Sequence, residues 1–195
     1  MRPDTTVEKL ANLKHAYDKS DAGTLTAGNS TPLTDGSSSV LLASEEWARE
    51  RGLPILAYLT HGQTSSVDFV EGEGLLMAPA VAVSEMIDRA GITLQDFDFY
   101  EIHEAFAAQV LCTLAAWESE EYCVNRLGRS GAMGTIDRAK LNVKGSSLAV
   151  GHPFAATGAR IVATLGKIID ENNGGRGLIS VCTAGGMGVT AILEK

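Results

Sequence analysis

Three short stretches of the sequence place a histidine or a cysteine beside glycines or at the expected end of a regular element. The first is 151–158, which contains His152 and Pro153. Proline suits the first position of a helix, so His152 is expected between a strand-like segment, 148–150, and the start of a helix. Exposed N–H groups at a helix N-terminus favour negative charge nearby. A histidine there can donate a hydrogen bond to an oxyanion or accept a proton from a thiol; the alternative is a surface histidine in a turn.

The second stretch, 181–188, places Cys182 at the end of an expected strand and before a glycine-rich turn. Glycines let backbone N–H groups approach a ligand closely. Cys182 can therefore be a nucleophile or an acid and base, or it can be a buried structural cysteine. The third stretch, 102–107, sets His103 beside Glu104 where a strand leads into a helix. Taken alone, this pair also has a purely structural explanation: His103 caps the turn, and Glu104 is an acid in the first turn that interacts favourably with the helix dipole.

The elements that must position these side chains alternate between strands and helices. Apolar patterning predicts strands at 55–63 and 97–102 and a C-terminal hairpin of 178–182 with 189–193. Helices are expected at 37–51 with Asp35 as N-cap, at 79–90 closed by Gly91, at 104–117 and at 157–170, with a helical turn at 93–96. Residues 23–27 favour a β conformation, and the apolar residues of 119–147 show no strong helical or strand periodicity. This order predicts a layered α/β domain with a mixed sheet over residues 23–195, after a polar lead-in segment, 1–22.

Composition narrows the function classes. The chain has 195 residues, 45% hydrophobic and 21% charged, with a net charge of −8. The acidic balance and the lack of a basic run argue against a nucleic-acid partner. Three sparse cysteines form no disulfide framework and no metal-ligand spacing, so no metal site is expected. Cys112 is expected on an apolar helical face and Cys123 in an irregular, partly exposed stretch. Without an apolar signal core or membrane span, the cytoplasm is the expected compartment.

The three stretches, in this order, resemble the thiolases. The motifs are Gly-His-Pro-x-x-Ala-Thr-Gly at 151–158, His-Glu-Ala-Phe at 103–106 and Cys-x-x-Gly-Gly-x-Gly at 182–188, preceded by Leu-Thr-Ala-Gly-Asn-Ser-Thr-Pro-Leu-Thr-Asp-Gly at 25–36. The resemblance covers nearly the whole chain, from about residue 2. Most thiolases carry Asn where this chain has His103. The histidine form is similar to the 3-ketoacyl-CoA thiolases of fatty-acid β-oxidation, and more narrowly to the thiolase subunit of the fatty-acid oxidation complex.

This resemblance implies a fold and a set of roles. The family consists of two similar α/β halves, each on a mixed five-stranded sheet. This sequence matches the second half, which ends in an antiparallel hairpin, together with the strand and loop that lead into it. His152 would line an oxyanion hole and help to activate the nucleophile, and His103 would complete that hole, directly or through a water. Cys182 would be the acid and base that moves a proton to and from the substrate carbon or the thiol of CoA. The backbone N–H of Ala184 would serve a second oxyanion site.

The resemblance also implies ligands and partners. Ala27 and Thr31 match positions that contact the pantetheine arm, and Thr31 keeps a hydroxyl where many relatives have Ser. Coenzyme A and acyl-CoA would be substrates, with no permanently bound cofactor. A homo-oligomer is expected, and the α subunit of the fatty-acid oxidation complex is a candidate partner.

The sequence departs from the family in one major respect. The acyl-accepting cysteine of thiolases lies in the first half, in a Cys-Ser-Ser-Gly-like turn, and this sequence contains no such turn. The loop domain that grips CoA is also unmatched. Without the covalent nucleophile the two-step route is lost, so we expect little or no activity from this chain alone and a need for an N-terminal thiolase half. Apolar surface that would face that half is expected to drive self-association.

Two other interpretations remain. A ketoacyl synthase also places a histidine before a small-residue turn, but it does not normally carry the terminal Cys-x-x-Gly-Gly-x-Gly, so Cys182 discriminates. A degenerate thiolase half could bind CoA esters, lipids or a partner protein without catalysis. The missing nucleophile favours that second interpretation, while the joint presence of His103, His152 and Cys182 argues against it.

Overall fold

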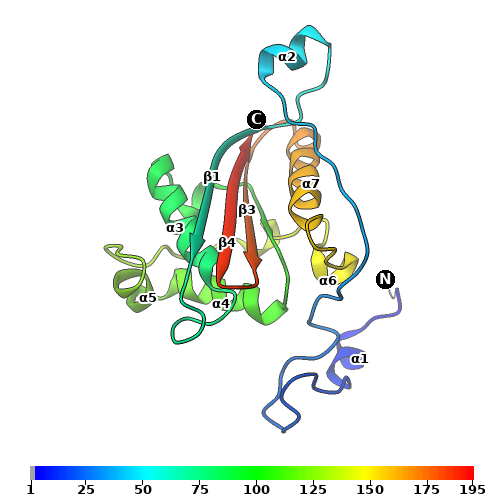
Figure 1. Cartoon of the computed structure of the whole chain (residues 1–195), viewed down its shortest axis with the longest axis vertical. Coiled ribbons are helices and arrows are strands. Elements are labelled where there is room, and N and C mark those ends of the chain that lie inside the picture. Colours follow the sequence, from blue (N-terminus) through cyan, green and yellow to red (C-terminus); the bar gives the residue numbers. More distant parts are fainter. Residues whose placement is uncertain (1–2) are drawn as a thin grey trace.

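A four-stranded mixed sheet forms the centre of the chain, whose computed structural model describes residues 3–195 (Figure 1). The strands are β1 (Tyr58–Ser66), β2 (Phe99–Ile102), β3 (Arg176–Thr183) and β4 (Met187–Glu194). Their order across the sheet is β1-β4-β3-β2. β3 and β4 form the expected antiparallel hairpin, with Cys182 opposite Gly188, and β1 runs antiparallel to β4. β2 is parallel to β3, with Ile102 opposite Ser180, so both strands end at the same edge of the sheet.

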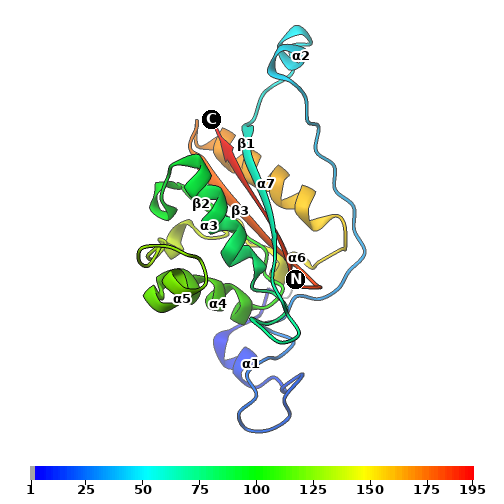
Figure 2. The same ribbon diagram turned by 60° about the vertical axis from the view of Figure 1, so that its left-hand side comes forward.

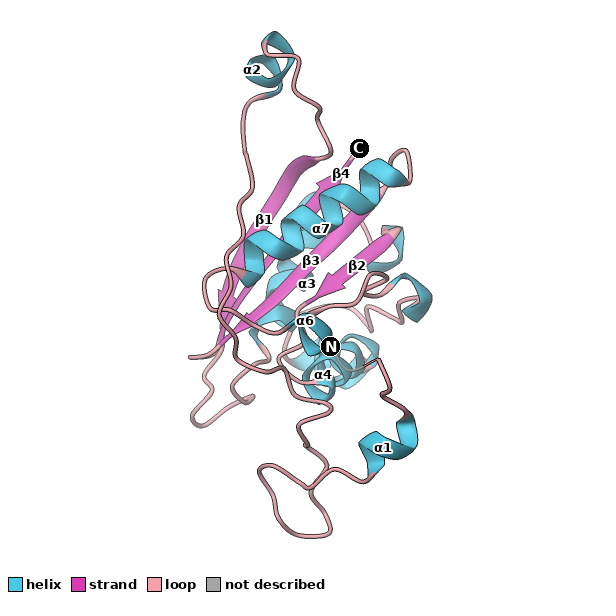
Figure 3. Ribbon diagram, turned by 90° about the vertical axis from the view of Figure 1, so that its right-hand side faces the viewer, coloured by secondary structure: helices cyan, strands magenta, loops and turns pink. Residues whose placement is uncertain are grey.

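Helices cover the two faces of this sheet (Figure 3). α3 (Ala78–Ala90) and α4 (Ala107–Glu118) pack on one face over a core that includes Met86, Tyr100 and Trp117. α7 (Thr157–Glu171) crosses the other face, where Ile161, Leu165 and Ile169 meet strand side chains. Strand side chains alternate between the two faces. Consecutive residues near the ends of β2 and β3 therefore contribute to opposite sides of the same edge.

Local sequence signals account for most of these elements. α3 has Pro79 in its first turn and ends at Gly91, whose φ of 68° is the left-handed cap that glycine adopts readily. A 3-10 turn, η1 (Leu94–Asp96), carries a capping box between Thr93 and Asp96. The apolar stripe of α7 is the one that a 3.6-residue period predicts. The structure confirms most of the expected elements, with ends displaced by a few residues. These are the strands at 55–63 and 97–102, the helices at 79–90, 104–117 and 157–170, and the C-terminal hairpin.

The five-stranded sheet is wrong: residues 3–195 supply only four strands. The β-prone stretch 23–27 makes a single bridge, between Thr26 and His15, and stays outside the sheet. The expected helix at 37–51 is also wrong in its first half. Residues 37–44 are extended, and helix α2 (Glu45–Glu50) is capped by Ser44 rather than Asp35. Leu41 and Leu42 are 72% and 67% exposed, so no packing stabilises a helix there.

Two short helices replace expected irregular or strand-like segments. Residues 148–150 belong to α6 (Ser147–Val150), a single helical turn between Gly145 and Gly151, both with positive φ. α5 (Glu120–Asn125) and the 3-10 turn η2 (Arg138–Lys140) lie inside the stretch 119–147. Pro153 does not begin the following helix, since α7 starts at Thr157 and Pro153 lies in the turn before it.

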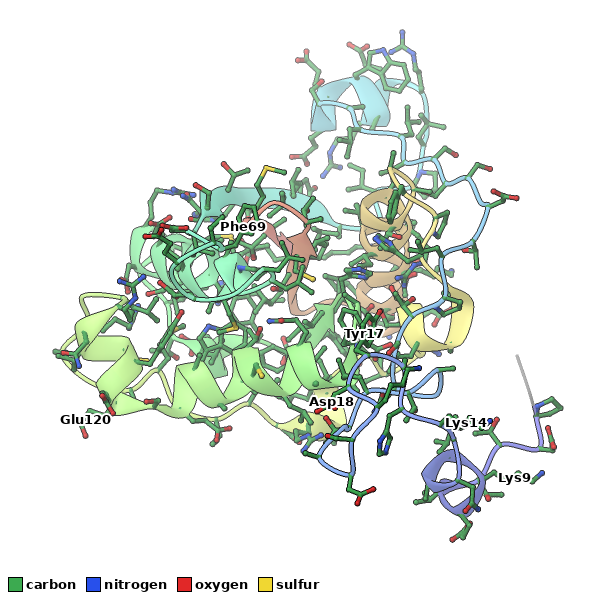
Figure 4. All side chains as sticks on the ribbon, turned by 60° about the horizontal axis from the view of Figure 1, so that its bottom comes forward. Lys9, Lys14, Tyr17, Asp18, Phe69 and Glu120 are labelled. Carbon is green, nitrogen blue, oxygen red and sulfur yellow. The ribbon has the colours of Figure 1, made fainter. Side chains whose placement is uncertain are left out.

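The N-terminal part extends away from this layered body (Figure 2). The helix α1 (Val7–Ala11) lies within the expected lead-in segment, of which residues 1–2 are outside the described part. Lys9 and Lys14 project from this segment at some distance from the sheet, whereas Tyr17 lies against the body (Figure 4), its ring 5.8 Å from that of Phe106. No helix among residues 3–195 is long and apolar enough to cross a membrane.

Candidate active site

A small enclosed cavity lies where β2 and β3 end. The cavity is lined on one side by residues at the ends of β2 and β3, which are Ile102, His103, Ser180 and Cys182. Residues of α3 and α4 line the other side: Pro79, Gln109, Val110 and Thr113. Its volume is about 10 Å³, close to what the centre of one water molecule needs. Ligands of open α/β sheets bind outside the carboxyl ends of the strands. Two of the three reactive residues expected from the sequence, His103 and Cys182, therefore share one cavity at such an edge.

His103 is held firmly and kept neutral. Its ring is 2% exposed, and its backbone N–H donates to the Ser180 carbonyl at 2.8 Å. Nδ1 lies 2.8 Å from the Ser147 hydroxyl, while Nε2 has no hydrogen-bond partner among the described residues. Burial lowers the pKa of His103 to about 3, helped by the charges of His152 and Arg160. At neutral pH the ring is a hydrogen-bonding group rather than a cation.

His152 lies against His103, with ring centroids 4.3 Å apart. Its Nδ1 is 2.6 Å from the hydroxyl of Thr157, the first residue of α7. Its backbone is anchored by a hydrogen bond to the Pro32 carbonyl, 2.9 Å long. Burial and the nearby charge of Arg160 lower the pKa of His152. The second histidine of the site is therefore also disposed to be neutral.

An open cleft of about 330 Å³ adjoins His152 on its other side. Its walls come from two segments that meet here: Leu33, Thr34, Asp35 and Gly36 from the N-terminal part, and His152, Pro153 and Phe154 from the turn before α7. Phe154 is 71% exposed. His152 thus lines the open cleft, and His103, whose ring it contacts, lines the smaller cavity.

Cys182 is the second-last residue of β3 and is buried. Burial raises the pKa of its thiol to about 11, although backbone hydrogen bonds at Cys182 and Ala105 act in the opposite direction. The thiol is therefore protonated at neutral pH. Gly188, its cross-strand neighbour, approaches α3 so closely that a Cβ there would lie 2.6 Å from the Pro79 nitrogen.

The remaining expected residues lie at different distances from this centre. Thr31 lines neither cavity and is linked to the site indirectly: its amide donates to the Ala105 carbonyl at 3.0 Å and its hydroxyl to the Ser147 carbonyl at 2.8 Å. Ala184 is exposed in the turn between β3 and β4, beside Gly185 and Gly186 with φ of 88° and 71°. Ala27 sits in the turn that the Asn29 amide closes onto the Thr26 carbonyl. Neither Ala184 nor Ala27 lines either of the two cavities.

Sequence reasoning missed a polar network behind the histidines. Arg160 of α7 donates to the Ser147 hydroxyl at 2.8 Å, and Ser147 in turn contacts His103. Glu101 is 1% exposed with both oxygens unpaired among the described residues, and burial raises its pKa to about 7, partly opposed by Arg160. The available signals in the sequence were polar residues in two positions: Glu101 near the end of an apolar strand, and Arg160 in the first turn of an amphipathic helix.

Glu104 has a structural role that its motif did not reveal. Its carboxylate accepts from the Asn142 side chain at 2.8 Å and from the Leu148 amide at 3.0 Å. These bonds fasten α6 to the end of β2. Glu104 also precedes α4 by three residues, so it is not in the first turn of that helix.

The other two cysteines are distributed differently from expectation. Cys112 is exposed on α4 rather than buried on its apolar face. Cys123 is fully buried in α5, with its sulfur 3.4 Å from the carbonyls of Ala116 and Trp117. Of the cysteines that the structure describes, only Cys182 lines the cavity. In residues 3–195 no three His, Cys, Asp or Glu side chains are grouped as metal ligands.

Comparisons with known sequences agree with the motifs. The profile of the thiolase C-terminal domain matches residues 53–195, and that of the thiolase N-terminal domain matches residues 1–46. The 3-ketoacyl-CoA thiolases of Yersinia enterocolitica and Yersinia pestis are 44% and 45% identical over 194 residues. These alignments cover 100% of this chain and 44% of each relative. The chain thus spans less than half the length of the curated relatives it matches.

Solved structures show the same relationship in three dimensions. The acetyl-CoA acetyltransferase of Bacillus anthracis superimposes with a TM-score of 0.77 at 36% identity, covering 99% of this chain and 43% of that one. Human mitochondrial 3-ketoacyl-CoA thiolase in complex with CoA superimposes with a TM-score of 0.75 at 29% identity, covering 100% and 44%. Since the C-terminal-domain profile alone covers most of the chain, and the fold agrees, the chain belongs to the thiolase family.

Proposed function

We propose that this chain supplies the acid/base and oxyanion-binding part of a 3-ketoacyl-CoA thiolase, an acyltransferase of fatty-acid β-oxidation. The observation that carries the proposal is the joint placement of His103, His152 and Cys182. His103 and Cys182 line one cavity, and His152 contacts His103 at 4.3 Å. The identity to 3-ketoacyl-CoA thiolases supports the substrate class.

The two histidines are proposed to stabilise the oxyanion that develops on the thioester carbonyl. Hydrogen-bond donors already in place, in a site that excludes water, are the largest contribution to many acyl-transfer reactions. A neutral His103 suits this role, because its buried Nε2 has no other partner among the described residues. His152, at the open cleft, would line the hole and assist deprotonation of the nucleophile, and His103 would complete the hole. The backbone N–H of Ala184 would serve the oxyanion that forms at the 3-keto carbon.

Cys182 is proposed to move the proton that carbon–carbon bond cleavage requires. When the nucleophilic cysteine attacks the 3-keto carbon and the bond to the neighbouring carbon breaks, the departing acetyl-CoA carbanion takes the proton of the Cys182 thiol. The resulting thiolate then takes the proton of the incoming CoA thiol, which attacks the acyl-enzyme. A thiol whose pKa is raised to about 11 donates to a carbanion and is readily reprotonated.

The nucleophile itself is proposed to come from an N-terminal thiolase half. Cys112 is exposed on α4 and Cys123 is buried in α5, and neither lines the cavity that contains Cys182. CoA and acyl-CoA are the proposed substrates, with Thr31 and Ala27 near the pantetheine arm. Homo-oligomerisation, association with the α subunit of a fatty-acid oxidation complex and a cytoplasmic location belong to the same proposal. The domain division at residues 22 and 23 also remains a proposal.

Thiolysis of a 3-ketoacyl-CoA by free CoA tests this function. We expect no turnover from the chain alone, and turnover after addition of the N-terminal half of the Yersinia enterocolitica relative. Cys182→Ala should then reduce the rate by about 100-fold or more, as loss of a general acid and base does. Cys112→Ala is the matched control and should leave the rate unchanged. Turnover by the chain alone that disappears in Cys182→Ala would assign the acyl group to Cys182 and overturn the proposed division of roles.

A non-catalytic CoA-ester or partner-binding role is the second candidate. The absence from this sequence of a Cys-Ser-Ser-Gly-like turn, which would carry the acyl-accepting cysteine, motivates it. Saturable binding of acyl-CoA to the chain, together with inactivity in the presence of an N-terminal half, would support this candidate over the first.

A further inference from the structure

The buried hydroxyl of Ser147 lies between a permanent cation and the ring of His103. The Arg160 guanidinium donates to Ser147 Oγ at 2.8 Å, and Ser147 Oγ is 2.8 Å from His103 Nδ1. Ser147 is fully buried and His103 is 2% exposed. Water is therefore excluded from the contact between Ser147 and His103, while Arg160 is partly buried.

The donors and acceptors of this chain can be counted. Arginine only donates, so Ser147 Oγ accepts from Arg160. The Ser147 hydroxyl then has one proton to give, and His103 Nδ1 is its only hydrogen-bond acceptor among the described residues. Every group is satisfied when Nδ1 carries a lone pair and the ring proton is on Nε2. The opposite tautomer would place two protons between Nδ1 and Oγ or leave a buried hydroxyl without an acceptor, which is costly.

We propose that Ser147, oriented by Arg160, is a positioning residue that holds neutral His103 in the tautomer with its proton on Nε2. The inference rests on the proposed function for its purpose, because a proton on Nε2 makes His103 a hydrogen-bond donor to a substrate oxygen. It also excludes His103 as a base at that atom. The nitrogen that has no partner in the described residues is then the donor of the site.

The charges around the ring favour the neutral form of His103. His152 faces His103 directly, and Arg160 approaches it through Ser147. The Glu104 carboxylate accepts hydrogen bonds from the Asn142 side chain and the Leu148 amide. Glu101 lies near Arg160 and offsets part of its charge. Because a proton added to His103 would lie near the permanent cation Arg160, the ring stays neutral. The hydrogen bond with Ser147 then decides which of the two neutral tautomers forms.

The tautomer can be measured directly by ¹⁵N NMR of the histidine rings in the isolated chain. A ring nitrogen with a proton and one without resonate far apart, and their couplings to the ring carbon protons identify which is which. At neutral pH we expect His103 to show a protonated Nε2 and an unprotonated Nδ1. A wild-type spectrum with the proton on Nδ1 would overturn the inference whatever the variants do.

Variants separate the positioning role from general packing. Ser147→Ala should lower the preference for the Nε2–H tautomer by about fivefold, the effect of one net hydrogen bond. Ser147→Thr, which keeps the hydroxyl, should restore it. Ser146→Ala is the matched control, since Ser146 is equally buried and also contacts Arg160, at 3.5 Å, but makes no hydrogen bond to the ring. It should leave the tautomer ratio unchanged. An unchanged ratio in folded Ser147→Ala would contradict the role of Ser147.

The same experiment distinguishes this inference from the proposed function. The tautomer is read in the chain alone and needs neither substrate nor an N-terminal half. If His103 carries its proton on Nε2 but the chain never supports thiolysis, the positioning role of Ser147 stands and the proposed thiolase function fails. If the chain supports thiolysis but the proton is on Nδ1, the thiolase function stands and the positioning role fails.

Discussion

At the residue scale, burial determines which groups of the site carry charge. The pKa of His103 is lowered to about 3 and that of Cys182 is raised to about 11, and desolvation is the largest cause in both cases. Both shifts favour the neutral form, as burial in a low-dielectric interior requires. A neutral donor beside a neutral thiol is suited to a reaction in which negative charge forms on the substrate and is then removed.

The thiol of Cys182 should show this protonation in its reactivity. Because the thiolate is the reactive form, we expect its alkylation by iodoacetamide to keep accelerating as pH rises from 8 towards 11. Peptide mass spectrometry gives the rates. Exposed Cys112 is the internal control for reagent quality and should be modified first at pH 8. Cys182 reacting as fast as Cys112 at pH 8 would contradict a buried, protonated thiol.

Glu101 provides a test through stability. Its folded-state pKa of about 7 exceeds the usual 4.5, so between these pH values the folded chain holds a proton that the unfolded chain has lost. The stabilising effect of this protonation is complete below pH 4.5 and is lost as pH rises through 7. Glu101→Gln removes that dependence. Relative to wild type, the variant should gain about 3 kcal/mol in free energy of unfolding between pH 5 and pH 8.

Urea unfolding at several pH values measures this difference. His103, whose shift has the opposite effect on stability, is present in both proteins and cancels from the comparison. Parallel stability curves for wild type and Glu101→Gln would show that the carboxyl is ionised in the folded chain throughout this range.

At the scale of elements, one glycine determines where His152 can lie. Gly151 has a φ of 92°, and a Cβ on it would lie 2.5 Å from the Thr34 side chain. This position ends α6 and turns the chain into His152, so strain here is transmitted to the site. The contact also joins the N-terminal segment to the turn before α7, which together form the open cleft.

Gly151→Ala should therefore destabilise the fold and disturb the site. We expect a loss of about 1–3 kcal/mol from the positive φ alone, and more from the clash with Thr34. Gly158→Ala is the matched control, because Gly158 lies in α7 with nothing within 4 Å of the added Cβ. That variant should be neutral or stabilise by up to about 1 kcal/mol. Thermal unfolding measures both, and equal effects would argue against a special conformation at Gly151.

The elements also show what sequence can predict and what it cannot. The helix ending at Gly91, the hairpin and α7 carry strong local signals, and they form where expected. The segment 37–44 has helical periodicity in its apolar residues but lacks a surface to bury them against, so it stays extended. The motifs singled out His103, His152 and Cys182, and the structure brings His103 together with Cys182 and with His152. Ser147 and Arg160 were not singled out, because a buried hydrogen-bond chain depends on tertiary contacts between α6, α7 and β2.

At the scale of the whole molecule, the N-terminal part leaves apolar side chains without partners. Leu41 and Leu42 lie in the extended segment before α2, which stands away from the sheet (Figures 1 and 2). β1 forms an edge of the sheet, and Leu59 on it is 53% exposed. Exposed apolar segments and open strand edges promote association between chains.

We expect the chain to self-associate in solution through these surfaces. Sedimentation velocity should show dimers or larger species at high concentration, and a Leu41→Glu, Leu42→Glu double variant should shift them towards monomer. Val124→Glu, at an exposed apolar position on α5, is the matched control and should leave association unchanged. A compact wild-type monomer at the highest concentration would contradict this expectation.

The most direct test of the thiolase assignment is the activity of a chimera. In it, this chain replaces the matching 44% of the Yersinia enterocolitica 3-ketoacyl-CoA thiolase, so that one polypeptide carries both halves. We predict thiolysis of a 3-ketoacyl-CoA by the chimera, retained in Cys112→Ala and reduced about 100-fold or more in Cys182→Ala. A folded chimera without thiolysis, or one whose rate is unaffected by Cys182→Ala, would contradict the assignment of Cys182 as the acid and base of the reaction.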